Sequence, residues 1–194
     1  VPLKSQLAPV PVIGVIEPGA RAGVAATRNR RIAVIATEGT VKGGAYARAI
    51  RKLMSDAEVV QQPCQVFVAL AEEGWTQSPA TLAAAEHYLG PLFRGPSAPD
   101  TLVLGCTHFP VLAGVIRETI GGAVALVDSA ETTSLAVADA LAHAGLESGA
   151  GVSGETAMRF FATDSPGRFA RVGAIFLGRP IEIASVELVD LRAV

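Results

Sequence analysis

The sequence predicts an α/β fold in which a parallel sheet is covered by helices on both faces. Short runs of β-branched and small residues alternate along the chain with longer segments of helical periodicity, and this alternation is typical of parallel sheets. The chain has 194 residues, half of them hydrophobic, so it can bury a substantial core.

The strands are expected where short runs rich in Val, Ile and Leu are bounded by turn residues. The run PVIGVIE, from Pro11 to Glu17, predicts a buried strand near the start of the chain. The later strands have the sequences RIAVIAT, AEVVQQ, TLVLGC, VALVD and VELVD, at residues 31–37, 57–62, 101–106, 124–128 and 186–190.

The helices are expected where apolar residues recur at helical spacing between recognisable start and stop signals. Pro18 is suited to a first helical turn, Ser78 with Pro79 is a typical helix start, and Gly145 is a typical helix end. The predicted helices lie at residues 18–27, 41–54, 78–93, 110–120, 131–145 and 165–178. A Gly/Ser-rich stretch from Glu147 to Glu155 is expected to be a surface loop.

Composition excludes several classes of protein. The formal net charge is −2 and the charges are scattered, so no surface for nucleic acid is expected. The apolar runs are short and interrupted, which predicts neither a membrane span nor a signal peptide. The two cysteines fit a reducing cytoplasm better than a disulfide scaffold.

The segment LGCTHFP carries the strongest functional signal. It places Cys106, Thr107 and His108 directly after a predicted strand, and ligands of parallel α/β folds bind at that end of the strands. A cysteine that stands alone is as often an ordinary small buried hydrophobic residue as a reactive thiol. A histidine two residues away favours a reactive thiol, because thiols react as thiolates and neighbouring groups control their pKa.

A second pair of candidates follows the strand at residues 31–37. Thr37 and Thr40 flank Glu38 and Gly39, so their two hydroxyls could face a small anionic ligand. The alternative is that they only cap the next helix, and the sequence leaves both interpretations open. Glu17 and Asp128 with Ser129 also stand at the ends of predicted strands.

The chain resembles glutamate racemases of the Asp/Glu racemase superfamily over nearly its whole length from Pro11. The segments that carry the resemblance are PVIGVIEPGARA, ATEGTVKGGAYARAI, CQVFVALAEEGW, LVLGCTHFPVL, LVDSAETT and RFARVGAIFLGRPIEIASVELVDL. The run GCTHFP is the most specific of them, because the related aspartate racemases lack it.

The resemblance implies roles for individual residues. Cys106 corresponds to the second of two catalytic thiols, His108 to its polarising partner, and Glu72 to a glutamate that orients or tunes His108, with Glu73 as the neighbouring alternative. Cys64 matches a cysteine that is not assigned to catalysis. The substrate-binding positions implied by the resemblance are Thr37, Thr40, Thr107 and His108.

The resemblance also implies two similar α/β lobes with the substrate between them. The second lobe would span residues 21–125, and residues 1–20 and 126–194 would supply an incomplete first lobe. The Asp-Ser-Gly and Cys-Asn-Thr runs that carry the family's first catalytic aspartate and cysteine do not occur in the sequence. We expect a fragment of a longer protein; a shortened, non-catalytic amino-acid-binding homologue is the alternative.

The activity implied by the resemblance is interconversion of L- and D-glutamate by proton transfer between two thiols. It needs no cofactor, and the chain shows no signal for a pyridoxal lysine. It would supply D-glutamate for peptidoglycan, and so for cell shape, in the cytoplasm; glutamate is the expected partner, and a homodimer is compatible with the resemblance. No metal site is expected, because the cysteines and histidines lack paired ligand spacing.

Overall fold

The computed structural model describes residues 6–8, 10–147 and 158–190, and the chain divides into two compact units. Unit 1 comprises residues 1–71 and 75–147, and unit 2 comprises residues 72–74 and 148–194. Apart from Glu147, the predicted loop at 147–155 lies outside the described residues. The lobe boundaries implied by the resemblance, 1–20, 21–125 and 126–194, stay a prediction.

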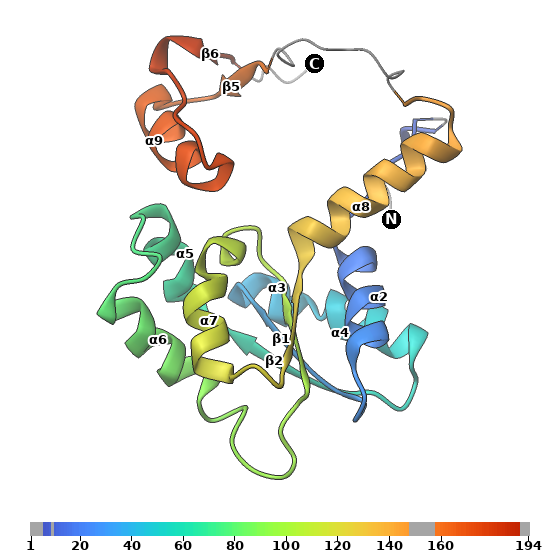
Figure 1. Cartoon of the computed structure of the whole chain (residues 1–194). Coiled ribbons are helices and arrows are strands. Elements are labelled where there is room, and N and C mark those ends of the chain that lie inside the picture. Colours follow the sequence, from blue (N-terminus) through green and yellow to red (C-terminus); the bar gives the residue numbers. More distant parts are fainter. Residues whose placement is uncertain (1–5, 9, 148–157, 191–194) are drawn as a thin grey trace. The chain divides into compact units, whose positions relative to one another are not determined.

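Unit 1 is built on a four-stranded sheet in the order β2-β1-β3-β4 (Figure 1). Every neighbouring pair is parallel, which confirms the predicted α/β fold with a parallel sheet. The strands are β1 (Arg31–Ala36), β2 (Glu58–Pro63), β3 (Thr101–Leu104) and β4 (Ala125–Asp128).

Helices cover both faces of this sheet. Figure 1 shows α2 and α4 on one side of the strands and α5, α6 and α7 on the other. The helical segments of unit 1 are α2 (Ile16–Ala26), α3 (Glu38–Gly43), α4 (Ala45–Leu53), α5 (Gln65–Glu72), α6 (Pro79–Leu89), the 3₁₀ turn η1 (Phe109–Leu112), α7 (Ala113–Ile120) and α8 (Ser129–His143).

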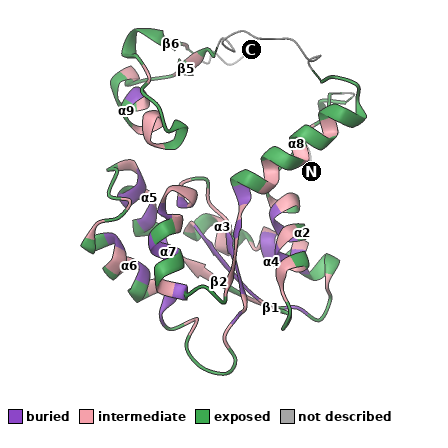
Figure 2. Ribbon diagram, in the orientation of Figure 1, coloured by how far each residue is buried: buried purple, intermediate pink, exposed green. Residues whose placement is uncertain are grey.

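The central strands are buried on both faces, as their apolar sequences require (Figure 2). Successive side chains point to opposite faces of a strand. In β3, Leu102 and Leu104 therefore pack with Phe67 of α5, whereas Val103 packs with Ile50 of α4. The sheet thus separates two apolar clusters and holds its strand ends in a fixed position.

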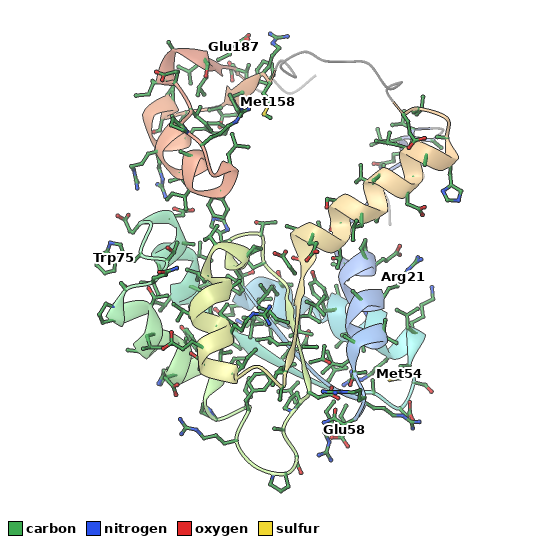
Figure 3. The ribbon with its side chains drawn as sticks, viewed as in Figure 1. Arg21, Met54, Glu58, Trp75, Met158 and Glu187 are labelled. Atoms are coloured by element: carbon green, nitrogen blue, oxygen red, sulfur yellow. The ribbon has the colours of Figure 1, made fainter. Side chains whose placement is uncertain are left out.

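The amino ends of the strands carry charged pairs. Arg31 Nε lies 2.9 Å from Oε2 of Glu58, which Figure 3 labels, and this ion pair joins the first residues of β1 and β2. Asp100, just before β3, accepts hydrogen bonds from the backbone N–H groups of Arg28 and Asn29 at 2.7 and 2.8 Å.

In the described residues, no helix is both long enough and apolar enough to cross a membrane.

The predicted strand at Pro11–Glu17 is wrong. Residues 11–14 have no regular secondary structure, and α2 begins at Ile16. An apolar run forms a strand only where a neighbouring strand satisfies its backbone groups, and no such partner exists among the described residues. The helices α3 and α5 were not predicted from the sequence. The predicted helix start at Ser78 and Pro79 is confirmed by the hydrogen bond from Thr81 N to Ser78 Oγ at 3.2 Å.

Unit 2 contains a small parallel pair of strands and one helix. Its elements are β5 (Phe160–Ala162), α9 (Pro166–Leu177), the 3₁₀ turn η2 (Ile183–Ser185) and β6 (Val186–Leu188). The Phe160 and Phe169 rings lie 6.0 Å apart, and Arg159 Nη2 lies 3.0 Å from Glu187 Oε2, which Figure 3 labels on β6. The helix predicted at 165–178 and the final strand are therefore confirmed.

Candidate active site

Four parallel strands bring separate sequence motifs to one edge of the sheet. The carboxyl ends of β1, β2, β3 and β4 lie at this edge because all four strands run in the same direction. The residues that follow them are Thr37, Cys64, the Gly105-Cys106 pair and Ser129. This edge is where α/β proteins bind their ligands.

The Cys106 thiol and the His108 ring face each other at the end of β3. Cys106 is half-buried, and its Sγ lies 3.8 Å from His108 Nδ1. Burial raises the pKa of Cys106, and the hydrogen bond from the His108 backbone N–H lowers it by a smaller amount. The predicted pairing of Cys106 with His108 is thus present in the geometry, and Thr107 between them is exposed.

A buried turn anchors the segment that contains Cys106 and His108. Phe109 and Leu112 of η1 are fully buried, and the Phe109 ring packs edge to face against Phe67 with ring centroids 5.4 Å apart. Pro110 stands at the start of the turn, where its fixed φ favours a helical conformation. The chain on either side of Cys106 and His108 is therefore held by the core.

Thr37 and Thr40 form the second polar group at this edge. Their Oγ1 atoms lie 3.1 Å apart, and both residues are half-buried. Thr37 precedes α3, yet its side chain makes no capping hydrogen bond within the described residues. Thr37 is therefore the N-cap residue of α3 without a capping bond from its side chain, and the predicted role of the paired hydroxyls toward a ligand stays a prediction.

Gly105 places Cys106 close to the central strand. Its N–H donates to the Ile35 carbonyl oxygen at 2.7 Å. A Cβ at this position would lie 2.9 Å from that oxygen and 3.0 Å from Cε2 of Tyr46. Only glycine therefore fits between β1 and the Tyr46 ring.

Replacing Gly105 by alanine is expected to lower the free energy of unfolding by roughly 1–3 kcal/mol, because the Ile35 backbone cannot move away from the added methyl group. Chemical denaturation measures the change. Gly43→Ala is the matched control, since a Cβ there meets nothing within 4 Å. Equal stability of both variants would contradict the close approach.

Cys64 lies in a different environment from Cys106. Its side chain is fully buried after β2, and Sγ donates a hydrogen bond to the Gln62 carbonyl oxygen at 3.6 Å. Burial raises the pKa of the Cys64 thiol to about 12. This thiol is therefore protonated at neutral pH and is unsuited to base catalysis.

Glu72 ends α5 and belongs to unit 2 by its contacts. Its carboxylate forms an ion pair with Arg168, and its carbonyl oxygen accepts a hydrogen bond from Arg171 Nη1 at 3.0 Å. Glu73 is exposed. The predicted influence of Glu72 on His108 stays a prediction.

Of the two other acids expected at strand ends, Asp128 ends β4 as predicted, whereas Glu17 does not follow a strand. Glu17 lies in the first turn of α2 rather than after a strand. Asp128 caps α8, because its Oδ1 accepts hydrogen bonds from the N–H groups of Ala130 and Glu131 at 2.7 and 3.3 Å.

Among the residues with described positions, no group of three or more His, Cys, Asp or Glu side chains is arranged to hold a metal ion.

Tyr46 is a residue near this edge that the sequence analysis did not single out. Its ring lies against Gly105, directly before Cys106. The position has the appearance of an ordinary core residue, because Tyr46 and Ile50 are spaced for one buried helix face. A polar atom at the tip of a core side chain gives no pattern along the sequence.

Comparison with known proteins finds glutamate racemases that are similar to nearly the whole chain. The curated glutamate racemase of Geobacter metallireducens is 48% identical over 184 residues, which cover 95% of this chain and 66% of that protein. The glutamate racemase of Syntrophus aciditrophicus is 42% identical over 185 residues, with the same coverage. The chain thus spans slightly less than two thirds of the length of these relatives.

Solved structures give the same result. The crystal structure of glutamate racemase isoform RacE1 from Bacillus anthracis matches with a TM-score of 0.85 and 32% identity, over 98% of this chain and 68% of that one. Glutamate racemase from Francisella tularensis, solved in complex with D-glutamate, matches with a TM-score of 0.83 and 30% identity, over 97% of this chain and 67% of that one. A sequence profile described as Asp/Glu/Hydantoin racemase matches residues 3–137, and the chain belongs to this family.

Proposed function

We propose that the chain carries one half of the proton-transfer machinery of a glutamate racemase. The observation that carries this proposal is the half-buried Cys106 thiol, 3.8 Å from His108 Nδ1, at the carboxyl edge of a parallel sheet. The glutamate racemases that match nearly the whole chain support glutamate as the substrate.

The reaction inverts Cα without a change of oxidation state. The Cys106 thiolate removes the α-proton of L-glutamate, and the electrons of the broken C–H bond remain on Cα and its carboxylate. A second acid returns a proton to the opposite face, so two groups on opposite sides avoid any need to turn the substrate. In the reverse direction, the protonated Cys106 delivers the proton.

The remaining residues of this edge would bind the substrate and assist proton movement. His108 would relay protons beside the sulfur, and Glu72 would tune it. The Thr37 and Thr40 hydroxyls, together with Thr107, would donate hydrogen bonds to glutamate oxygens. The reaction would need no cofactor and would supply D-glutamate for peptidoglycan in the cytoplasm, with a homodimer as a compatible assembly.

Residues 1–194 alone are expected to exchange the α-proton of glutamate with solvent but to produce no D-glutamate. Cys106 reaches one face of Cα, and Cys64 is buried with its pKa raised to about 12, so it cannot serve the other face. Incubation with L-glutamate in deuterated water, followed by mass spectrometry and chiral chromatography, measures both products.

Each outcome of this experiment is informative. Deuterium at Cα without inversion supports the proposal. D-Glutamate that still forms after Cys64→Ala would overturn the two-thiol mechanism. Glutamate binding without any exchange would overturn the catalytic proposal and favour the amino-acid-binding homologue.

A further inference from the structure

The last residue of α5 has a side chain that its place in the helix disfavours. The carboxyl end of a helix carries a partial negative charge, so cations are favoured there and carboxylates are not. Glu72 nevertheless ends α5, and α5 has no basic residue in its last turn. The Glu72 carboxylate and the carbonyl groups at this helix end therefore need positively charged or N–H partners from elsewhere in the chain.

One face of α9 supplies these partners. Arg168, Arg171 and Ile175 are spaced by three and four residues, which places them along one side of the helix. Arg168 forms the ion pair with the Glu72 carboxylate, and Arg171 Nη1 donates to the Glu72 carbonyl oxygen at 3.0 Å. Ile175 Cδ1 lies 3.4 Å from an ideal Cβ on Gly74. We call these three contacts the α9 clamp.

The clamp holds a well-defined turn. Gly74 has a φ of +73°, and Trp75 N donates to the Leu70 carbonyl oxygen at 2.9 Å, as in a Schellman motif. Residues Glu72–Gly74 belong to the same compact unit as α9. Glu73, the neighbouring alternative from the sequence, is exposed and makes none of the clamp contacts. The clamp therefore distinguishes Glu72 from Glu73.

We propose that Arg168 and Arg171 are positioning residues for Glu72: Arg168 holds the carboxylate, and Arg171 holds the carbonyl group at the end of α5. The significance for the reaction rests on the proposed function, in which Glu72 tunes His108. Neither arginine contacts substrate or transfers a proton. The Glu72 side chain is 26% exposed and that of Arg168 is 64% exposed, so salt is expected to weaken the clamp.

The first test measures the clamp without turnover. Trp75, which Figure 3 labels, is the single tryptophan of the sequence and directly follows the clamped residues. In Arg168→Gln, hydrogen–deuterium exchange of the Trp75 N–H, followed by NMR, is expected to be roughly two- to fivefold faster, because the ion pair is lost. Salt at about 0.5 M should accelerate this exchange more in the unmodified chain than in Arg168→Gln. Equal Trp75 exchange in both proteins would overturn the clamp.

The second test asks whether Arg168 acts through Glu72. Deuterium incorporation at Cα of glutamate is measured for Arg168→Gln, for Glu72→Ala and for the double variant. Arg168→Gln is expected to lower kcat by roughly two- to tenfold with little change in KM. The double variant should be no slower than Glu72→Ala, because Arg168 then has no carboxylate to position. Losses that multiply in the double variant would contradict the positioning role.

Arg159→Gln is the matched control. Arg159 Nη2 lies 3.0 Å from Glu187 Oε2, so this variant removes another exposed ion pair of the same unit and leaves Glu72 untouched. It is expected to change neither the Trp75 exchange nor the α-proton exchange. Arg168→Lys keeps the positive charge and should recover most of both. An effect of Arg159→Gln as large as that of Arg168→Gln would rule out a specific clamp.

The two measurements separate this inference from the proposed function. Faster Trp75 exchange in Arg168→Gln, in a chain that exchanges no α-proton, would support the clamp and overturn the catalytic proposal. α-Proton exchange in the unmodified chain, together with Trp75 exchange that is the same with and without Arg168, would support the catalytic proposal and overturn the clamp.

Discussion

Replacing Cys106 by serine is expected to reduce deuterium incorporation at Cα of L-glutamate by roughly 100- to 10,000-fold, the range that a positioned acid–base group contributes. A serine hydroxyl cannot replace a thiol as the base, because its pKa is far higher. The side chain is half-buried and packs only partly against the core, so the free energy of unfolding should change by less than about 1 kcal/mol. Exchange kinetics and chemical denaturation measure the two quantities separately.

Cys64→Ala is the matched control for this experiment. The Cys64 side chain is fully buried and its thiol is protonated at neutral pH, so the exchange rate should stay within about twofold of the unmodified chain. Exchange that survives in Cys106→Ser would exclude Cys106 as the base. A loss of several kcal/mol of stability in that variant would instead assign Cys106 to the core.

Alkaline pH is expected to destabilise the folded chain through Cys64. Its pKa is raised from 9.0 to about 12, because the folded interior excludes the water that would stabilise the thiolate. The protonated thiol's contribution to stability is complete below about pH 9 and is lost as pH rises to about 12. The loss is about 4 kcal/mol by the linkage between pKa and folding.

Denaturant titrations at several values of pH test this result. Cys64→Ala should show a shallower decline across the same range, because it lacks the thiol. The tyrosines and lysines that also ionise there are common to both proteins, so their contribution cancels in the comparison. The difference between the two slopes isolates the Cys64 thiol. Parallel declines in both proteins would mean that the Cys64 thiol does not resist ionisation in the folded state.

The fold was predictable where a residue's surroundings follow from its neighbours in sequence. The runs in β1 and β3 are apolar at every position, and both strands are buried on both faces. The run at Pro11–Glu17 has the same local character but lacks a partner strand in the described structure. Local pattern identifies a segment that can become a strand, and pairing, which is non-local, decides whether it does.

In the candidate site, too, the contacts that were predictable are those between residues close in the sequence. Cys106 and His108 are close in sequence, so a single turn after a strand brings the two side chains together. Thr37 and Thr40 are similarly local. Tyr46 could not be found in this way, because its contact with Gly105 joins two segments that are far apart in the sequence.

The hydrogen bonds at the end of β1 have a mechanical consequence. The Ile35 carbonyl oxygen accepts from Gly105 N at 2.7 Å, and the Ala36 carbonyl oxygen accepts from Cys64 N at 2.9 Å. The last two peptide units of β1 are therefore hydrogen-bonded to the chain on both sides. Ala36 directly precedes Thr37, and Gly105 directly precedes Cys106. The hydroxyl pair and the thiol thus follow residues that are both tied to the end of β1, so we expect the spacing between the two groups to stay nearly constant when a ligand binds.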